Sequence, residues 1–143
     1  MKALTLTQPW ASLIALRKKR FETRSWGTAY RGKLAIHAAK GFPKHCQDFA
    51  ARCRETGIAL RDPLPLGEVI CTVELVDVWT VIEQMQGGVK LELTDGCRLQ
   101  LGGQELAFGD YRDGRKIWEL RDLVVLPIPI QAKGALSLWE WEP

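Results

Sequence analysis

Residues 17–33 concentrate positive charge and aromatic rings in one short segment, RKKRFETRSWGTAYRGK. The segment contains seven Lys and Arg residues and a single acidic residue, Glu22. The whole chain of 143 residues carries a formal net charge of only +3, so the remainder is slightly acidic. A concentrated positive patch on such a body attracts polyanions, and a solvated charged surface is the alternative interpretation of any basic run.

The arginines and aromatic residues of this segment are suited to bind a nucleotide chain. A guanidinium binds phosphate through two parallel hydrogen bonds, and an exposed ring stacks on a base with roughly 1–3 kcal/mol per base. The candidate nucleic-acid contacts are Arg17, Lys18, Arg24, Trp26, Tyr30, Arg31 and Tyr111. Packing in the core is the competing role for each ring, because large aromatic side chains mostly bury area.

Hydrophobic spacing predicts the elements that position these residues. Trp10, Leu13, Ile14 and Arg17 recur at helical spacing after Pro9, which predicts a short helix that ends at the cations. A longer amphipathic helix is expected at 42–57 and a short one at 80–85. Strands are expected at 2–7, 33–38, 67–76, 115–126 and 136–141, and a long loop or loose hairpin at 87–104.

This pattern predicts an α+β fold, with five or six strands in a small mixed barrel or curved sheet and two or three short helices. Pro127 and Pro129 confine the end of the fourth strand to an edge or an extended connection. Trp10, Trp118, Trp139 and Trp141 are expected in the core.

Length and composition favour one soluble domain spanning residues 1–143. The chain is 46% hydrophobic and 26% charged, which is ordinary for a globular fold. Its longest apolar runs are far shorter than the roughly 20 residues that span a bilayer. We therefore expect a cytoplasmic protein with no membrane partner.

Cysteine and histidine spacing predicts neither disulfides nor a metal site. Cys46, Cys53, Cys71 and Cys97 show no CxxC pair, and His45 beside Cys46 lacks a second tight ligand pair. We expect reduced thiols, no metal and no cofactor. His37, between small apolar residues, is expected to be a hydrogen-bonded structural histidine.

Six motifs carry a resemblance to a known family. They are QPWASLI (8–14), KKRFETRSW (18–26), YRGKLAIHAAK (30–40), GEVICTVEL (67–75), FGDYRDGRKIWEL (108–120) and GALSLWEW (134–141). Together they resemble the ASCH domain family, whose fold is similar to that of PUA domains. The resemblance implies a PUA-like β-barrel with flanking helices and a central cleft, and a role in RNA metabolism. Some small members hydrolyse the amide of acetylated cytidine with a Lys, a Thr and a Glu, and ribonuclease activity has been proposed for others.

The family pattern K-x-x-E/T-x-R falls on Lys19, Glu22 and Arg24, and a second family carboxylate on Glu105. Lys19, Glu22 and Glu105 are therefore the candidate catalytic residues that the resemblance implies. Glu22 departs from the threonine of the hydrolytic members, although Thr23 is adjacent. Two further departures concern backbone geometry: Arg17 and Ser137 stand where the family usually has glycine.

If residues 21–25 form a strand, as the family implies, its two faces divide the basic run. Phe21 and Thr23 then lie on one face and Glu22 and Arg24 on the other. Lys19 can still meet Glu22 if it sits in the turn before the strand. An ordinary surface ion pair, worth under about 1 kcal/mol, is the alternative. As a base, Lys19 would need a lowered pKa, which neighbouring cations favour and Glu22 opposes.

We expect an RNA- or modified-nucleoside-binding ASCH domain, with the base in the barrel cleft beside the basic patch. The alternatives are an enzyme, either an amidohydrolase on acetylated cytidine or a ribonuclease, and a protein-interaction module that binds through residues 90–105. If Lys19 lines the cleft, Lys19→Met should leave the melting temperature near wild type.

Overall fold

The structure is a computed structural model that describes residues 1–143. Its residue contacts divide the chain into two compact units. Unit 1 comprises Met1–Arg17, Lys33–Val73 and Asp122–Pro143, and unit 2 comprises Lys18–Gly32 and Glu74–Arg121. Two long strands, β4 (Glu68–Met85) and β7 (Lys116–Gln131), contribute residues to both units.

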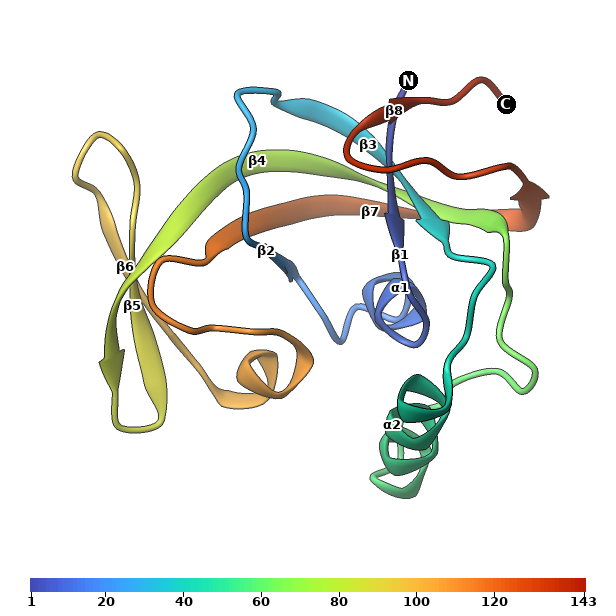
Figure 1. Ribbon diagram of the computed structural model, residues 1–143, viewed down its shortest axis with the longest axis horizontal. Coiled ribbons are helices and arrows are strands. Elements are labelled where there is room, and N and C mark those ends of the chain that lie inside the picture. The colour runs from blue at the N-terminus through green and yellow to red at the C-terminus, as the bar shows by residue number, and fades with distance from the viewer. The chain divides into compact units, whose positions relative to one another are not determined.

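Unit 1 is built on a short parallel strand pair. Strand β1 (Lys2–Leu6) pairs in parallel with β3 (Gly32–Ala38) and antiparallel with β8 (Trp139–Glu140), which brings the two chain ends together (Figure 1). Ala3, Ala35, Val69 and Trp141 pack as a buried cluster. The parallel pairing requires a crossover between β1 and β3, and this connection carries the first helix.

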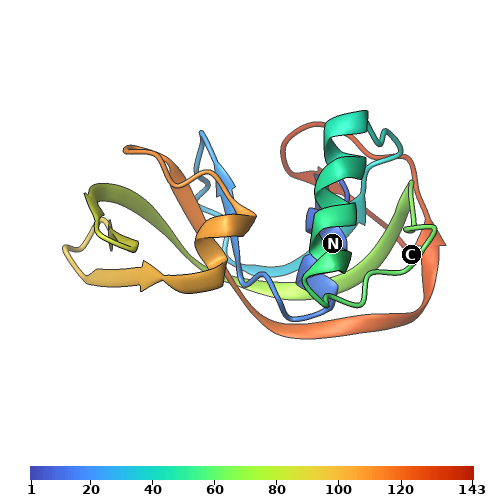
Figure 2. The same ribbon diagram turned by 90° about the horizontal axis from the view of Figure 1, so that it is seen from below.

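Helices α1 (Trp10–Ala15) and α2 (Lys44–Glu55) lie close together in this unit (Figures 1 and 2). The rings of Trp10 and Phe49 stack with centroids 5.2 Å apart and join the two helices. The fully buried Gln8 side chain holds the start of α1, because its Oε1 accepts a hydrogen bond from the backbone N–H of Ser12. This bond satisfies one of the donors that a helix leaves free in its first turn.

Unit 2 consists of an antiparallel meander and a strand pair. Strands β4, β5 (Gly88–Glu92) and β6 (Arg98–Gly102) pair in succession, and a 3₁₀ helix, η1 (Gly103–Phe108), follows (Figure 1). Strand β2 (Phe21–Arg24) pairs antiparallel with β7. The core of this unit contains Phe21, Trp79, Val81, Val89, Leu91, Leu101, Tyr111 and Ile117.

The α+β class and the two to three short helices are confirmed, but the expected strand count is too low. The sheet has eight strands, because residues 87–104 form the hairpin of the two expected alternatives, with β5 and β6 as its paired strands. The expected helix at 80–85 is wrong. Those residues continue β4, where pairing with β5 from Thr80↔Glu92 onward, with a bulge between Val81 and Glu83, replaces the local helical preference.

The expectations for the proline-containing segment and for the burial of the tryptophans are met in part. Pro127 and Pro129 lie in the extended end of β7, as predicted. Trp118 and Trp141 are buried, whereas Trp10 and Trp139 are half-buried. The last strand is shorter than expected and spans only two residues. All four cysteines are free thiols, and neither α-helix has the length and apolar character that crossing a membrane requires.

Candidate functional site

Lys19 lies in unit 2, immediately before β2, with its side chain fully buried. Its Nζ donates hydrogen bonds to the backbone carbonyls of Phe21, at 2.6 Å, and Phe108, at 2.8 Å. The third neighbour is Glu22, whose Oε1 lies 3.4 Å away. Two hydrogen bonds and a close carboxylate surround the nitrogen, so the Lys19 side chain is fixed in place.

Glu22 joins Lys19 to Arg24 along β2. While Oε1 faces Lys19, Oε2 accepts a hydrogen bond of 2.8 Å from Nε of Arg24. The carboxylate is 11% exposed. The expected Lys19–Glu22 contact is confirmed, and the surface-pair alternative does not apply because both side chains are removed from water.

Glu105 reaches the same cluster from the first turn of η1 and is 5% exposed. Its Oε1 accepts a 2.5 Å hydrogen bond from the backbone N–H of Arg20, whose Nε is 3.6 Å away. Its Oε2 is buried and has no hydrogen-bond partner. Burial raises the pKa of this carboxyl, against the opposing effects of the Arg20 N–H, the charges of Lys19 and Arg20, and the nearby Phe21 N–H.

Tyr111 supplies a second polar atom without a partner. Its side chain belongs to the core of unit 2, and its buried hydroxyl makes no hydrogen bond. Burial, followed by the negative charges of Glu105 and Glu22, raises the pKa of this phenol. The two carboxylates therefore act on the hydroxyl that lacks a partner, and the Tyr111 ring is too buried to serve as an exposed stacking face.

Thr23 fixes the FGDY segment against β2. Its Oγ1 accepts a hydrogen bond from the backbone N–H of Asp110 at 2.9 Å. A Cβ on Gly109 would stand 2.6 Å from Cγ2 of Thr23 and 3.0 Å from Cε2 of Tyr111, so only glycine allows this approach. Thr23 thus has a positioning role next to Phe108, whose carbonyl binds Lys19.

Several of the expected nucleic-acid contacts are already engaged within unit 2. Arg24 is bonded to Glu22, and Arg31 donates from Nη1 to the carbonyls of Thr28 and Tyr30. Trp26 packs edge-on against Trp118, with centroids 4.9 Å apart, and its carbonyl accepts the indole N–H. Tyr30 is half-buried.

The exposed cations of unit 2 at this point are Lys18 and Arg20. Lys18 forms no ion pair, and the Arg20 side chain is 68% exposed. Arg17 belongs to unit 1 and has a φ of 63°. The structure therefore separates the basic run into a buried positioning lysine and exposed charges on either side of it.

A hollow of about 600 Å³ opens beside Tyr111. Leu106 and Tyr111 line it together with the β4–β5 turn and the segment after FGDY. The lining residues are Gln84, Met85, Gly87, Gly88, Val89, Leu106, Tyr111, Arg112 and Asp113. Tyr111 thus lines this hollow and also lies near the buried carboxylates of Glu105 and Glu22.

The sequence alone missed three parts of this site. The carbonyl of Phe108 and the backbone N–H of Arg20 carry no side-chain signature, so no residue pattern could have indicated them. Tyr111 was assigned to stacking, and its buried hydroxyl was not foreseen. No group of three or more His, Cys, Asp or Glu residues is placed to hold a metal ion.

Comparison with known proteins defines the class of this chain. The ASCH domain family matches residues 4–106, and the chain belongs to that family. The match includes Lys19, Glu22 and Glu105 and ends before Tyr111. That residues 1–143 form a single ASCH domain stays a prediction.

Among curated proteins, the chain is similar to activating signal cointegrator 1. It is 35% identical to the human protein and 34% identical to the mouse protein, over 79 residues in each case. The matched segment is 52% of this chain and only 14% of each relative. Most of each cointegrator therefore lies outside the matched segment.

Proposed function

We propose that this ASCH domain binds RNA or a modified nucleoside through the cluster in unit 2. The observation that carries the proposal is the pair of buried atoms without partners, Oε2 of Glu105 and the hydroxyl of Tyr111. Buried polar groups are almost always hydrogen-bonded, so a group without a partner requires an explanation. A carboxylate that accepts and a phenol that donates or accepts match the polar edge of a base.

The surrounding charges support recognition of a ligand by rigid groups. Lys19 donates hydrogen bonds to the carbonyls of Phe21 and Phe108 and forms an ion pair with Glu22, which holds these groups in place. Glu105 is fixed through one oxygen by the Arg20 N–H, which leaves the other oxygen for the ligand. A site whose contacts are already held loses little side-chain entropy on binding.

Lys18 is the best-placed cation for the phosphates of a bound strand, because it is exposed and forms no ion pair. Arg20 is also exposed, although its Nε lies 3.6 Å from Glu105. Arg24 and Arg31 would first have to leave their present partners. Binding to single-stranded RNA should be salt-dependent, and each lost phosphate contact should lower the log–log salt slope by roughly 0.7. We expect this decrease in Lys18→Gln.

The direct test uses Tyr111→Phe, with Tyr30→Phe as the matched control. Loss of the Tyr111 hydroxyl should weaken binding of RNA oligonucleotides and nucleosides about tenfold, which corresponds to one hydrogen bond. Its melting temperature should not fall, since the hydroxyl has no partner in the free protein. Unchanged binding by both Tyr111→Phe and Glu105→Gln, measured by calorimetry, would refute the proposal.

Amide hydrolysis of an acylated cytidine is the second candidate, and the raised pKa of Glu105 favours it. A carboxyl with a raised pKa can take a proton from water as it attacks the acyl carbon and return it to the leaving nitrogen. The products would be acetate and cytidine. In this scheme Lys19 stabilises charge, because its Nζ is bound to two carbonyls and lies 3.4 Å from Glu22.

Acetate release from acetylated cytidine separates the two candidates. Hydrolysis predicts turnover by the wild type, loss of turnover in Glu105→Gln, and retention in the exposed control Lys44→Gln. Glu22→Thr, which restores the residue of the hydrolytic members, should raise the rate if this departure limits it. If the wild type and Glu22→Thr both bind the nucleoside but neither releases acetate, hydrolysis is refuted and the binding function stands.

A further inference from the structure

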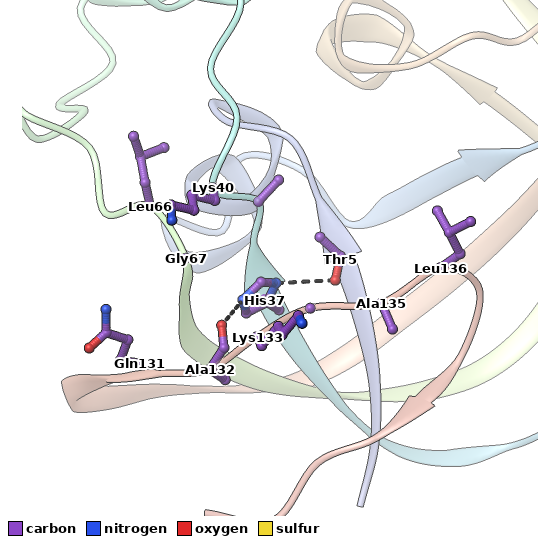
Figure 3. Close-up of a pocket in the computed structure, with 12 residues that line it drawn as sticks. Thr5, His37, Lys40, Leu66, Gly67, Gln131, Ala132, Lys133, Ala135 and Leu136 are labelled. Carbon is purple, nitrogen blue, oxygen red and sulfur yellow. Dashed lines mark hydrogen bonds between the residues drawn. The ribbon is translucent and has the colours of Figure 1, made fainter.

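Unit 1 contains a separate cavity of about 870 Å³ beside His37 (Figure 3). Its wall comes from β1, from the end of β3 and the two residues after it, from Leu66 and Gly67, and from the end of β7 with the segment 132–136 that follows. A volume of this size is typical of small-molecule sites in proteins. None of the candidate residues in the unit 2 cluster lines it.

The charge of this cavity is positive and not neutralised. Lys40 and Lys133 line it, and no aspartate or glutamate does. Neither lysine forms an ion pair, whereas Lys2 and Lys44 elsewhere in the unit each pair with a carboxylate. Two such ammonium groups at one cavity favour a ligand that brings its own negative charge.

His37 fixes the segment that carries Lys133. One ring nitrogen, Nε2, lies 2.8 Å from the carbonyl oxygen of Ala132, which can only accept, so Nε2 is the donor. Nδ1 lies within hydrogen-bond distance of Oγ1 of Thr5, at 3.1 Å (Figure 3). The same oxygen accepts a hydrogen bond from Nε1 of Trp139 at 3.0 Å. His37 is therefore a positioning residue, as the sequence predicted for a structural histidine.

Gly134 allows the same segment to lie directly on His37. A Cβ at this position would be 2.7 Å from Cε1 of His37 and 2.8 Å from Oγ1 of Thr5. The backbone between Lys133 and Ala135 is thus pressed against a rigid support at the cavity wall.

Apolar side chains form another part of the lining, beside the polar side chains of Thr5 and Gln131. Ala39, Leu66, Ala135 and Leu136 face the cavity, and Leu136 is 93% exposed. An inorganic anion alone would use the lysines and leave these side chains without contacts. A ligand that joins a phosphate to an uncharged organic group would use both parts of the wall.

We infer that this cavity binds an organic phosphate monoester, with Lys40 and Lys133 on the phosphate and the apolar part of the wall on the organic group. The inference is independent of the function proposed for unit 2. The phosphate could also come from free inorganic phosphate, which shares the same chemistry, and the experiment distinguishes these sources.

The test is a titration of the ¹⁵N-labelled chain with cytidine 5′-monophosphate, inorganic phosphate and cytidine, followed by amide chemical shifts. We expect the monophosphate to shift the amides of residues 133–136 and to bind at least tenfold more tightly than the other two ligands. Lys40→Gln/Lys133→Gln should weaken monophosphate binding at least tenfold. The control Lys2→Gln/Lys44→Gln removes the same charge outside the cavity and should change binding less than twofold.

Three results would overturn the inference. They are shifts confined to residues outside the cavity lining, equal weakening by the two double variants, and equal binding of inorganic phosphate and the monophosphate. Melting temperatures establish that the variants are folded, and the exposed Lys40 and Lys133 are not core residues. Tyr111→Phe and Glu105→Gln should leave the shifts at 133–136 unchanged, so failure of the unit 2 proposal remains distinguishable.

Discussion

Nζ of Lys19 lies 3.4 Å from Oε1 of Glu22, and the two side chains are 0% and 11% exposed. The pair spans only three residues, yet the Phe108 carbonyl completes it from 89 positions away. A buried charge is tolerated only when it is paired and hydrogen-bonded, so each of these oxygens supports the others. The cluster consequently responds as a unit when one member is removed.

Lys19→Met should destabilise the protein by about 3 kcal/mol or more, because it leaves Glu22 and two carbonyls without a buried donor. The melting temperature should fall by about 10 °C. This outcome replaces the expectation, made from sequence, of an unchanged melting temperature. The exposed neighbour Lys18→Met is the control and should melt near wild type, as circular dichroism can establish.

Glu105→Gln should raise stability at neutral pH and change it little in acid. A raised carboxyl pKa means that the native state binds more protons than the unfolded state, so stability falls as pH rises from the ordinary glutamate pKa through the folded value. Glutamine keeps the acceptor for the Arg20 N–H and removes this dependence. Melting curves from pH 4 to pH 8 measure the difference, and an equal loss at every pH would contradict the raised pKa.

Gly109→Ala should destabilise the protein by about 1–3 kcal/mol, because its Cβ would overlap Thr23 and Tyr111. Thr23→Ala removes both atoms of Thr23 that the new Cβ would meet. The double variant should therefore lose less stability than the sum of the two single variants in urea unfolding. Gly41→Ala, which meets no atom within 4 Å, is the control.

Arg17→Gly should stabilise the protein by about 0.5–1 kcal/mol, because Arg17 has a φ of 63° and glycine adopts this conformation without a Cβ penalty. Ser137 has a φ of 58°, so we expect a similar stabilisation from Ser137→Gly. Lys18→Gly, at a residue without positive φ, should instead lower stability. Chemical denaturation measures the stability of all three variants. A destabilised Arg17→Gly would mean that the interactions of the Arg17 side chain stabilise the protein more than its backbone conformation destabilises it.

Several features of this protein followed from the sequence because their causes are local. Alternation and helical spacing predicted β1, α1, β3 and α2, and the departures from glycine at Arg17 and Ser137 coincide with positive φ. The Lys19–Glu22 contact could also be foreseen from the sequence, since the two residues lie on either side of the turn that leads into β2. The ASCH motifs identified the family.

Tertiary structure decided the character of the site. Residues 80–85 became strand because β5 offers hydrogen bonds that an isolated helical turn cannot match. Lys19 is buried, unlike its solvated neighbours, and the carbonyl of Phe108, distant in sequence, accepts its hydrogen bond. Glu105 and Tyr111 are also buried, and each keeps one polar atom without a hydrogen-bond partner. Burial and pKa depend on the sum of all neighbours in space, and the residues nearest in sequence supply only part of that sum.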